Sequence, residues 1–377
     1  MNRVRIQAAK RTPVAPRGGA LRDVEVWALA APLIRNLLSD THIDAGAVDA
    51  VIMGNALYAG GNPARLSALA AGLPDTVAAF TLDTQCCAGL DAISLGFDMI
   101  ASGRAHVVIA GGFESFSRAP LRARKPGRGE HAPVPYARPP FSPWPERDPD
   151  LIDAAAALAS ERGVARETQA AFAIESHRKA RLDAGNPAEL VAIEGLERDA
   201  FPRQLNAALC ARAPVLAGDE KTGVCTATVA VEADAAAAVL LVADNGLMPG
   251  ESGAQSVQLI DAVSIGGDPA QPARVPVAAT RALCQRHVLD ASDVHVVEVM
   301  EAFAIQAMTT CDELGLVDER VNRGGGALAR GHPIGASGAI LAVRLWHELQ
   351  REEPGALGLA TIAAAGGLGS TVLMERP

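Results

Sequence analysis

Apolar residues recur along this chain in short runs that alternate with stretches of helical spacing. The runs at 4–9, 47–54 and 77–82 are largely apolar and bounded by turn-forming residues, which is typical of buried strands. Residues 24–38 and 62–71 instead show the periodicity of helices that pack on a core. Strands that alternate with helices predict an α/β fold with a largely parallel sheet.

The stretch 77–112 combines a predicted strand, a turn, a helix and a second strand, and Cys86 lies at the turn. A helix N-terminus offers unpaired N–H groups and the positive end of a dipole, both of which favour a thiolate over a thiol. We therefore predict that Cys86 is a nucleophile and that Gly89 lets a ligand approach the backbone. The alternative is that Cys86 and Cys87 are two small buried hydrophobic residues, which is the commoner role of a cysteine.

The composition changes at residues 118–149, where closely spaced prolines predict an excursion from the core. The basic residues at its start could meet the phosphates of a nucleotide-like ligand, although a solvated loop is the commoner explanation. Residues 151–182 are predicted to be helical, with His177 at the surface. Residues 229–242 are rich in alanine and are expected to return the chain to the core.

The C-terminal third repeats the plan of the N-terminal third. A strand, a helix, a second helix and a second strand are predicted at 294–300, 302–314, 339–349 and 359–364. The glycine-rich loop NRGGGALARGHPIGASG stands in the middle of this series and contains His332. With Cys86 on one half and His332 on the other, the duplication predicts two loops that face each other, with an active site between the halves.

Composition limits the kind of protein. The 377 residues are enough for two core-forming units, and 49% hydrophobic but only 3% aromatic residues predict a core of Ala, Val, Leu and Ile. A net charge of -9 argues against nucleic acid or a membrane surface as a partner. Neither a signal peptide nor a run long enough to span a bilayer is recognisable. Six cysteines without paired spacing fit a cytoplasmic protein. The CQRH segment is only a weak pattern for a metal site, so we expect no bound metal ion.

Several motifs resemble those of the thiolases: AAKRTPV, GNPAR, QCCAGLDA, AGGFES, EAFA and above all GGALARGHPIGASG. The resemblance implies a thiolase fold, in which two duplicated α/β halves form five layers, α-β-α-β-α, with an inserted loop domain. In this chain the N-terminal half would comprise 1–115 plus 233–254, the loop domain 116–232 and the C-terminal half 255–377. The resemblance also implies an acyl-CoA thioester as substrate, no cofactor, and a homodimer or homotetramer.

The resemblance also implies roles for individual residues. Cys86 would take the acyl group as a thioester and His332 would activate it, which agrees with the need of covalent catalysis for a thiolate and a base. Backbone N–H groups at the Cys86 turn and at Gly367 and Gly369 are expected to form an oxyanion hole. Two positions depart from the family pattern, because Met300 replaces an asparagine and Ala363 replaces a second catalytic cysteine.

These departures leave three hypotheses open. An alanine cannot move a proton, so general acid–base assistance of about 10² to 10⁴-fold would be missing from the carbon–carbon step. The first hypothesis is an acyltransferase that acylates Cys86 but is impaired in thiolysis and Claisen condensation. The second is an ordinary acetyl-CoA acetyltransferase or 3-ketoacyl-CoA thiolase with another acid–base group. The third is a subunit of a multiprotein acyltransferase complex. A decarboxylating ketoacyl synthase ranks lower, because Met300 stands where its relatives use a histidine.

Overall fold

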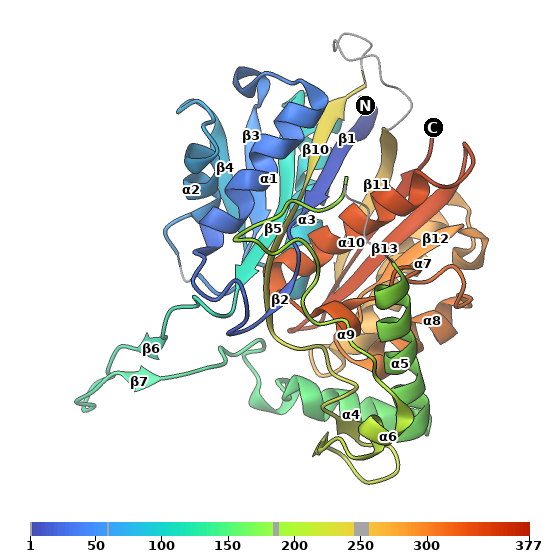
Figure 1. Cartoon of the computed structure of the whole chain (residues 1–377). Coiled ribbons are helices and arrows are strands. Elements are labelled where there is room, and N and C mark those ends of the chain that lie inside the picture. Colours follow the sequence, from blue (N-terminus) through green and yellow to red (C-terminus); the bar gives the residue numbers. More distant parts are fainter. Residues whose placement is uncertain (1, 59, 184–187, 245–255) are drawn as a thin grey trace.

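The computed structural model describes residues 2–58, 60–183, 188–244 and 256–377 (Figure 1). Its strands are β1 (Val4–Arg11), β2 (Ala15–Pro16), β3 (Ala50–Gly54), β4 (Ala78–Leu82), β5 (Val107–Ser115), β6 (Ala123–Arg124), β7 (Val134–Pro135), β8 (Val215–Ala217), β9 (Val224–Cys225), β10 (Ala233–Ala243), β11 (Val257–Gly266), β12 (Val296–Val299), β13 (Leu357–Ala364) and β14 (Leu368–Glu375). Its helices are α1 (Val26–Thr41), α2 (Pro63–Ala70), α3 (Ala88–Ala101), α4 (Leu151–Arg162), α5 (Arg166–Leu182), α6 (Ala207–Ala211), α7 (Val275–His287), α8 (Ala304–Leu314), α9 (Ala327–Arg330) and α10 (Ile334–Leu349).

One sheet runs through both halves of the molecule, in the order β12-β13-β14-β11-β1-β10-β5-β3-β4, with β2 added beside β10. The two halves join where β1 pairs with β11 through Val4, Arg5 and Ile6. Among the described strands of this sheet, only the pairs β3/β4, β3/β5 and β12/β13 are parallel. The prediction of a largely parallel sheet is therefore wrong, because alternation of strands and helices does not show that β10, β11 and β14 return antiparallel.

Helices cover the sheet in layers, as the α/β prediction requires (Figure 1). Helices α1 and α2 pack on the outer face of the N-terminal half, and α7 and α8 pack on the outer face of the C-terminal half. Helices α3 and α10 pack together between the halves, in a core that strands of both halves share. Every residue of α10 from Gly335 to Leu349 is buried, which explains why its sequence is apolar on nearly all sides. The α/β class and its layered arrangement are confirmed.

The segment between β5 and β10 leaves the sheet at Ser115 and returns at Ala233. Its first part is an arm with strands β6 and β7, which projects from the body in Figure 1. Its second part carries α4, α5 and α6, of which α4 and α5 pack against α8. The helix predicted at 151–182 is two helices, because Gly163 adopts a left-handed φ of 64°. The predicted boundary between residues 254 and 255 lies outside the described residues.

Two predictions about burial are wrong. Strand β4 is the terminal strand of the sheet, and Phe80 on it is 51% exposed, because an apolar run does not reveal whether a neighbouring strand exists. His177 is buried, since its ring lies against Phe201 and its Nδ1 accepts a hydrogen bond from the N–H of Arg203 at 3.3 Å. The chain that covers α5 comes from later in the sequence, so the polar neighbours of His177 within its helix did not indicate it.

Buried ion pairs attach the middle segment to both halves. Arg11 of β1 pairs with Asp199 at 2.7 Å, and Arg330 in the glycine-rich loop pairs with the same carboxylate at 3.0 Å. Arg344 of α10 pairs with Glu189 at 2.7 Å. Breaking one partner of such a pair leaves an uncompensated buried charge, so the network fixes one arrangement of these segments. None of the helices in the described ranges is long and apolar enough to cross a membrane.

Candidate active site

Cys86 lies where the chain turns from β4 into α3. The turn is a short 3₁₀ helix, η2 (Gln85–Cys87), in which Gln85 has a left-handed φ of 56°. The side chain of Asp83 supports this turn, because its Oδ1 accepts the Gln85 N–H at 2.9 Å. Cys86 is 9% exposed and belongs to the shared core. The predicted place of Cys86 at a strand–helix turn is where the structure has it.

His332 lies between α9 and α10, at the end of the glycine-rich loop. Its backbone N–H donates to the carbonyl of Val231 at 2.7 Å, which ties this loop to the segment that enters β10. Gly331 precedes it with φ of 115°, a conformation that other residues rarely adopt. The Nε2 atom of His332 is 3.1 Å from Sγ of Cys86, although 246 positions separate the two residues. The structure thus brings together the two residues that the sequence placed on separate halves.

Close packing of α3 against α10 makes this contact. A Cβ atom on Gly89 would lie 2.7 Å from the carbonyl oxygen of Gly335, and one on Gly338 would lie 2.7 Å from the backbone nitrogen of Leu90. Real side chains do not tolerate such distances, so glycine is required for the two backbones to touch. The close approach expected at Gly89 therefore serves helix α10 and not a ligand.

The second ring nitrogen of His332 fixes the orientation of its imidazole. Its Nδ1 is 2.6 Å from Oγ of Ser337, and the hydroxyl of Ser337 donates to the carbonyl of Pro333 at 3.1 Å. Because that hydroxyl has a single hydrogen, we assign the ring proton to Nδ1, which donates to Ser337. Nε2 is then free to accept the proton of Cys86, so the pair is arranged for general-base activation of the thiol.

Burial keeps this pair neutral. It raises the pKa of Cys86 to about 12, against backbone hydrogen bonds from Ala365 and from Cys86 itself that lower it. It also lowers the pKa of His332 to about 4. The helix N-terminus was predicted to favour a thiolate, but desolvation exceeds that effect here. The resting pair is a thiol and a neutral imidazole, and the thiolate forms only when the proton moves to Nε2.

Two backbone amides reach the sulfur of Cys86, that of Ala365 and that of Cys86 itself. The amide of Cys86 belongs to the turn that was predicted to supply oxyanion-hole donors. Gly367 packs beside Gly267 and Asp268 and Gly369 packs beside Val275, and their part in an oxyanion hole stays a prediction. Ala365 itself precedes Gly366 and Gly367, whose φ values of 80° and 76° turn β13 into β14. The sequence indicated the turn but not which of its amides faces the thiol.

Met300 and Ala363, the two positions that depart from the family pattern, differ in burial. Met300 is 1% exposed and lines a cavity together with Ser337, and the residues that line this cavity do not include Ala363. Ala363 pairs with Gly369 across β13 and β14 and is partly exposed. Its neighbours Ile362 and Ala364 belong to the shared core, so Ala363 lies on the opposite face of β13. That Met300 and Ala363 face one substrate pocket stays a prediction.

The other cysteines do not replace a second catalytic thiol. Sγ of Cys87 lies 3.7 Å from the carbonyl oxygen of Ile362, so this side chain points away from His332. The remaining ones are free and buried at positions Cys210, Cys225, Cys284 and Cys311. Among the described residues, no group of three or more His, Cys, Asp or Glu side chains is placed to hold a metal ion.

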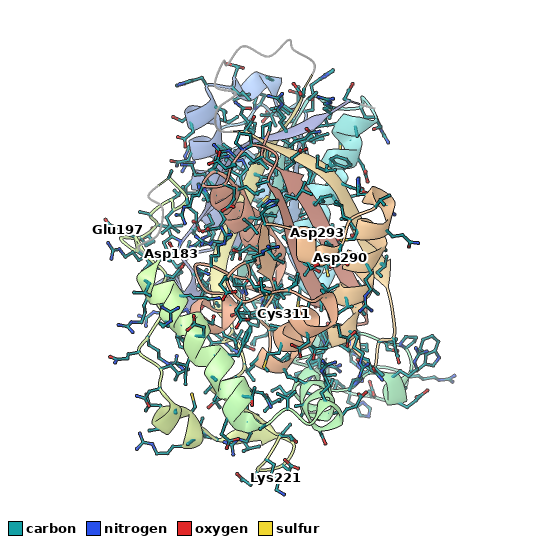
Figure 2. The ribbon with its side chains drawn as sticks, turned by 90° about the vertical axis from the view of Figure 1, so that its right-hand side faces the viewer. Asp183, Glu197, Lys221, Asp290, Asp293 and Cys311 are labelled. Carbon is teal, nitrogen blue, oxygen red and sulfur yellow. The ribbon has the colours of Figure 1, made fainter. Side chains whose placement is uncertain are left out.

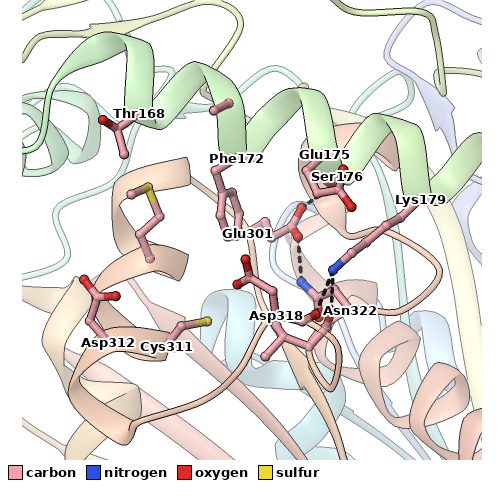
Figure 3. Close-up of a pocket in the computed structure, with 13 residues that line it drawn as sticks. Thr168, Phe172, Glu175, Ser176, Lys179, Glu301, Cys311, Asp312, Asp318 and Asn322 are labelled. Atoms are coloured by element: carbon pink, nitrogen blue, oxygen red, sulfur yellow. Dashed lines mark hydrogen bonds between the residues drawn. The ribbon is translucent and has the colours of Figure 1, made fainter.

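A pocket of about 350 Å³ lies between α5 and α8, and its lining contains neither Cys86 nor His332 (Figure 3). Glu301 of the EAFA motif lines it and accepts hydrogen bonds from Ser176 Oγ at 2.7 Å and from Asn322 Nδ2 at 2.6 Å. It also accepts the Leu328 N–H at 3.2 Å. Glu301 thus holds the loop before His332 against α5. Cys311, labelled in Figure 2, is also part of this lining.

Two participants were missed in the sequence. Ser337 orients His332, but the predicted helix began only at residue 339 and left Ser337 in the glycine-rich loop, although the helix in fact begins at Ile334. Ala365 contributes through its backbone, which no side-chain pattern can reveal. Cys86 and His332 themselves were predictable, because the duplicated halves placed them on matching loops.

Comparison with known proteins gives a consistent result over the whole chain. Family models described as "Thiolase, N-terminal domain" and "Thiolase, C-terminal domain" match residues 4–245 and 254–376. A Bacillus subtilis protein named "Putative acetyl-CoA C-acetyltransferase YhfS" is 38% identical, covering 100% of this chain and 99% of its own. An acetyl-CoA acetyltransferase of Bacillus anthracis superposes with a TM-score of 0.88 at 28% identity, covering 100% of this chain and 99% of its own. Human mitochondrial 3-ketoacyl-CoA thiolase in complex with CoA gives 0.89 at 27%, covering 99% and 98%.

The neutral pair predicts an unusual pH profile for alkylation of Cys86. Transfer of the proton from sulfur to Nε2 leaves the number of protons on the pair unchanged. The alkylation rate should therefore not depend on pH between 5 and 9, because this range lies between the pKa of His332, about 4, and the pKa of Cys86, about 12. In His332→Ala the thiol must lose its proton to solvent. The rate should then rise about tenfold per pH unit and be at least about 10²-fold slower at pH 7.

The measurement is the rate of iodoacetamide labelling of the Cys86 peptide, followed by mass spectrometry from pH 5 to 9. A Cys87→Ala background removes the neighbouring thiol, whose side chain points to Ile362. A wild-type rate that rises with pH as steeply as that of His332→Ala would rule out His332 as the base.

Proposed function

Because this chain belongs to the thiolase family of acyltransferases, we propose that it takes an acyl group from an acyl-CoA thioester onto Cys86. The observation that carries the proposal is the distance of 3.1 Å between Sγ of Cys86 and Nε2 of His332. Each residue comes from a different half, and the glycine contact between α3 and α10 holds them together. No cofactor is needed for this reaction, since the thiol and the imidazole supply the nucleophile and the base.

Acylation follows from the geometry in two steps. The proton of Cys86 moves to Nε2 of His332 while the sulfur attacks the thioester carbonyl, and the carbonyl oxygen becomes negatively charged. The amide of Ala365, which already hydrogen bonds the sulfur of Cys86, is a donor for this oxygen. When the carbon–sulfur bond to coenzyme A breaks, the leaving thiolate takes the proton from Nε2. His332 returns to its neutral form, which its lowered pKa favours.

The second half of the reaction decides between two functions. An acyl group on Cys86 can pass to another thiol with the same residues, whereas cleavage of a carbon–carbon bond must also protonate a carbanion. Ala363 cannot do so, and we propose that thiolysis and Claisen condensation are impaired for that reason. The second candidate, an ordinary acetyl-CoA acetyltransferase, is favoured by the name of the Bacillus subtilis relative.

We further propose a cytoplasmic homo-oligomer. All six cysteines are free, as a reducing compartment requires. The terminal strand β4 has no charged residue, and an uncharged exposed edge favours pairing with another chain. Phe80 on β4 and Leu66 and Leu69 on the adjacent α2 are all exposed. We propose that a second copy of this chain covers this patch. The division into 1–115 plus 233–254, 116–232 and 255–377 remains our proposal for the domains.

Cys86 should be the only residue that becomes acylated. Incubation with acetyl-CoA or longer acyl-CoAs should add one acyl group to the wild type and none to Cys86→Ala, because Cys86 has the imidazole of His332 at hydrogen-bond distance. Intact-mass and peptide mass spectrometry measure the result. Cys87→Ala is the matched control and should be acylated like the wild type. Acylation that persists in Cys86→Ala would disprove the assignment.

Restoring a thiol at position 363 should raise carbon–carbon chemistry selectively. We expect Ala363→Cys to increase thiolysis of acetoacetyl-CoA by about 10² to 10⁴-fold and to change acyl exchange between thiols much less. Ala363→Ser is the control, because it has nearly the same size but does not ionise near neutral pH. If the unmodified protein already turns over acetoacetyl-CoA at a median enzyme rate of about 10 s⁻¹, the impaired-site proposal fails and the ordinary thiolase stands.

A charge on the exposed edge strand should disrupt the oligomer. Phe80 is 51% exposed, so Phe80→Asp should leave the fold intact and convert the oligomer to monomer, because a carboxylate resists burial between two copies. Analytical ultracentrifugation measures the mass, and circular dichroism checks the fold. Val288→Asp, at a residue 94% exposed beyond α7, is the control that should keep the wild-type mass. An unchanged mass for Phe80→Asp would place the interface elsewhere.

A further inference from the structure

A small cavity lies next to His332, between α10 and the end of β12. Its volume is about 20 Å³, and the residues that line it include the polar Glu298, Arg330, Ser337 and Arg344 among apolar ones such as Met300 and Ile340. A cavity needs roughly 10 to 15 Å³ of this kind of volume to hold one water molecule. The cavity is therefore large enough for one water molecule.

Two polar atoms of the lining side chains are buried and unsatisfied. Oε1 of Glu298 and Nε of Arg344 have no hydrogen-bond partner among the residues that the structure describes. Both residues are 1% exposed, so bulk solvent does not satisfy them. The other nitrogens of Arg344 are engaged, because Nη1 donates to Glu189 at 2.7 Å and Nη2 to Glu348 at 2.9 Å. A buried N–H and a buried carboxyl oxygen without partners are rare in folded proteins, and each requires an explanation.

We propose that one water molecule occupies this cavity and makes Glu298 a positioning residue for His332. The water accepts a hydrogen bond from Nε–H of Arg344 and hydrogen bonds to Oε1 of Glu298 and Oγ of Ser337. These three partners are the usual number for a buried water. The inference rests on the proposed role of His332 as the base for Cys86.

The water completes the hydrogen bonding of Ser337. Its hydroxyl donates to the carbonyl of Pro333 and accepts Nδ1–H of His332, which leaves one lone pair for the water. When His332 takes the proton of Cys86, the imidazolium donates more strongly through Nδ1. A serine oxygen held by the water, Glu298 and Arg344 cannot turn away, so the charged form of the ring is stabilised in the reactive orientation.

The arrangement does not depend on the charge of Glu298. Burial raises the pKa of this carboxyl to about 8, with Arg344 and Arg330 opposing the shift and Glu348 and Glu189 adding to it. As a carboxylate Glu298 accepts from the water, and as a neutral acid it donates to it. In both cases the water can still donate a hydrogen bond to Oγ of Ser337.

A crystal structure of the full chain is the first test. We expect a water molecule within hydrogen-bond distance of Oε1 of Glu298, Nε of Arg344 and Oγ of Ser337. A dry cavity, or a direct bond between Glu298 and Arg344 that closes it, would overturn the proposal. This measurement uses the wild type and does not depend on whether any variant folds.

The second test compares Glu298→Leu, which removes the polar group, with Glu298→Gln, which keeps an oxygen and an N–H for the water. The rate of Cys86 labelling by iodoacetamide at pH 7 should fall about tenfold in Glu298→Leu, because that is the effect of losing one net hydrogen bond. In Glu298→Gln the rate should stay within about threefold of the wild type. The labelling rate falls at acid pH, where His332 becomes protonated. This fall should move to lower pH in Glu298→Leu only, because the imidazolium of His332 is less stabilised there. Circular dichroism and thermal unfolding verify the fold.

Equal labelling rates for the wild type and Glu298→Leu would overturn the inference. If Glu298→Leu does not fold, the water in the wild-type crystal and the rate of Glu298→Gln decide. The labelling reaction needs no acyl-CoA, so failure of the wild type to become acylated counts against the proposed function and leaves this test intact.

Discussion

Backbone contact between α3 and α10 is the constraint on which the rest of this structure depends. Gly89 and Gly338 let the two helices touch, and Gly112 on β5 lies so close to Gly335 that a Cβ atom would be 1.9 Å from its carbonyl oxygen. Side chains at these positions would separate the helices by the width of at least one methyl group. Since η2 leads into α3 and His332 precedes α10, such a separation would take Cys86 away from its base.

The electrostatics of the site follow from the same burial. A helix terminus alone would make a reactive thiolate, but the shared core removes so much water that the neutral thiol and imidazole are preferred. In the proposed reaction, charge would develop only when a substrate is present, and the Ala365 amide would stabilise it. The same burial encloses charged side chains that need partners. Carboxylates of the middle segment supply them, because Asp199 pairs with Arg11 and Arg330 and Glu189 pairs with Arg344.

How far the sequence predicted this molecule depended on whether a feature was local or arose from tertiary packing. The position of Cys86 at a strand–helix turn, its partner His332 and the α/β layers came from periodicity, duplication and the family resemblance. The direction of β10, the exposure of Phe80 on β4 and the burial of His177 depend on segments distant in sequence. The backbone amide of Ala365 and the cavity beside Ser337 have no side-chain signature. Sequence patterns thus identified Cys86 and His332, whereas contacts between distant segments determined the burial and hydrogen bonding around them.

The proposed function separates acyl transfer from carbon–carbon chemistry, and the two altered positions bear on these steps in different ways. Ala363 lies on the face of β13 opposite to Ile362 and Ala364, which pack in the core that positions Cys86. A thiol can therefore be present or absent there without disturbing the contact between Cys86 and His332. Met300 is different, because it fills space beside Ser337 and so lies against the support of the base. On the proposed function, a change at position 363 would alter which reaction follows acylation, whereas a change at position 300 would act on the support of His332.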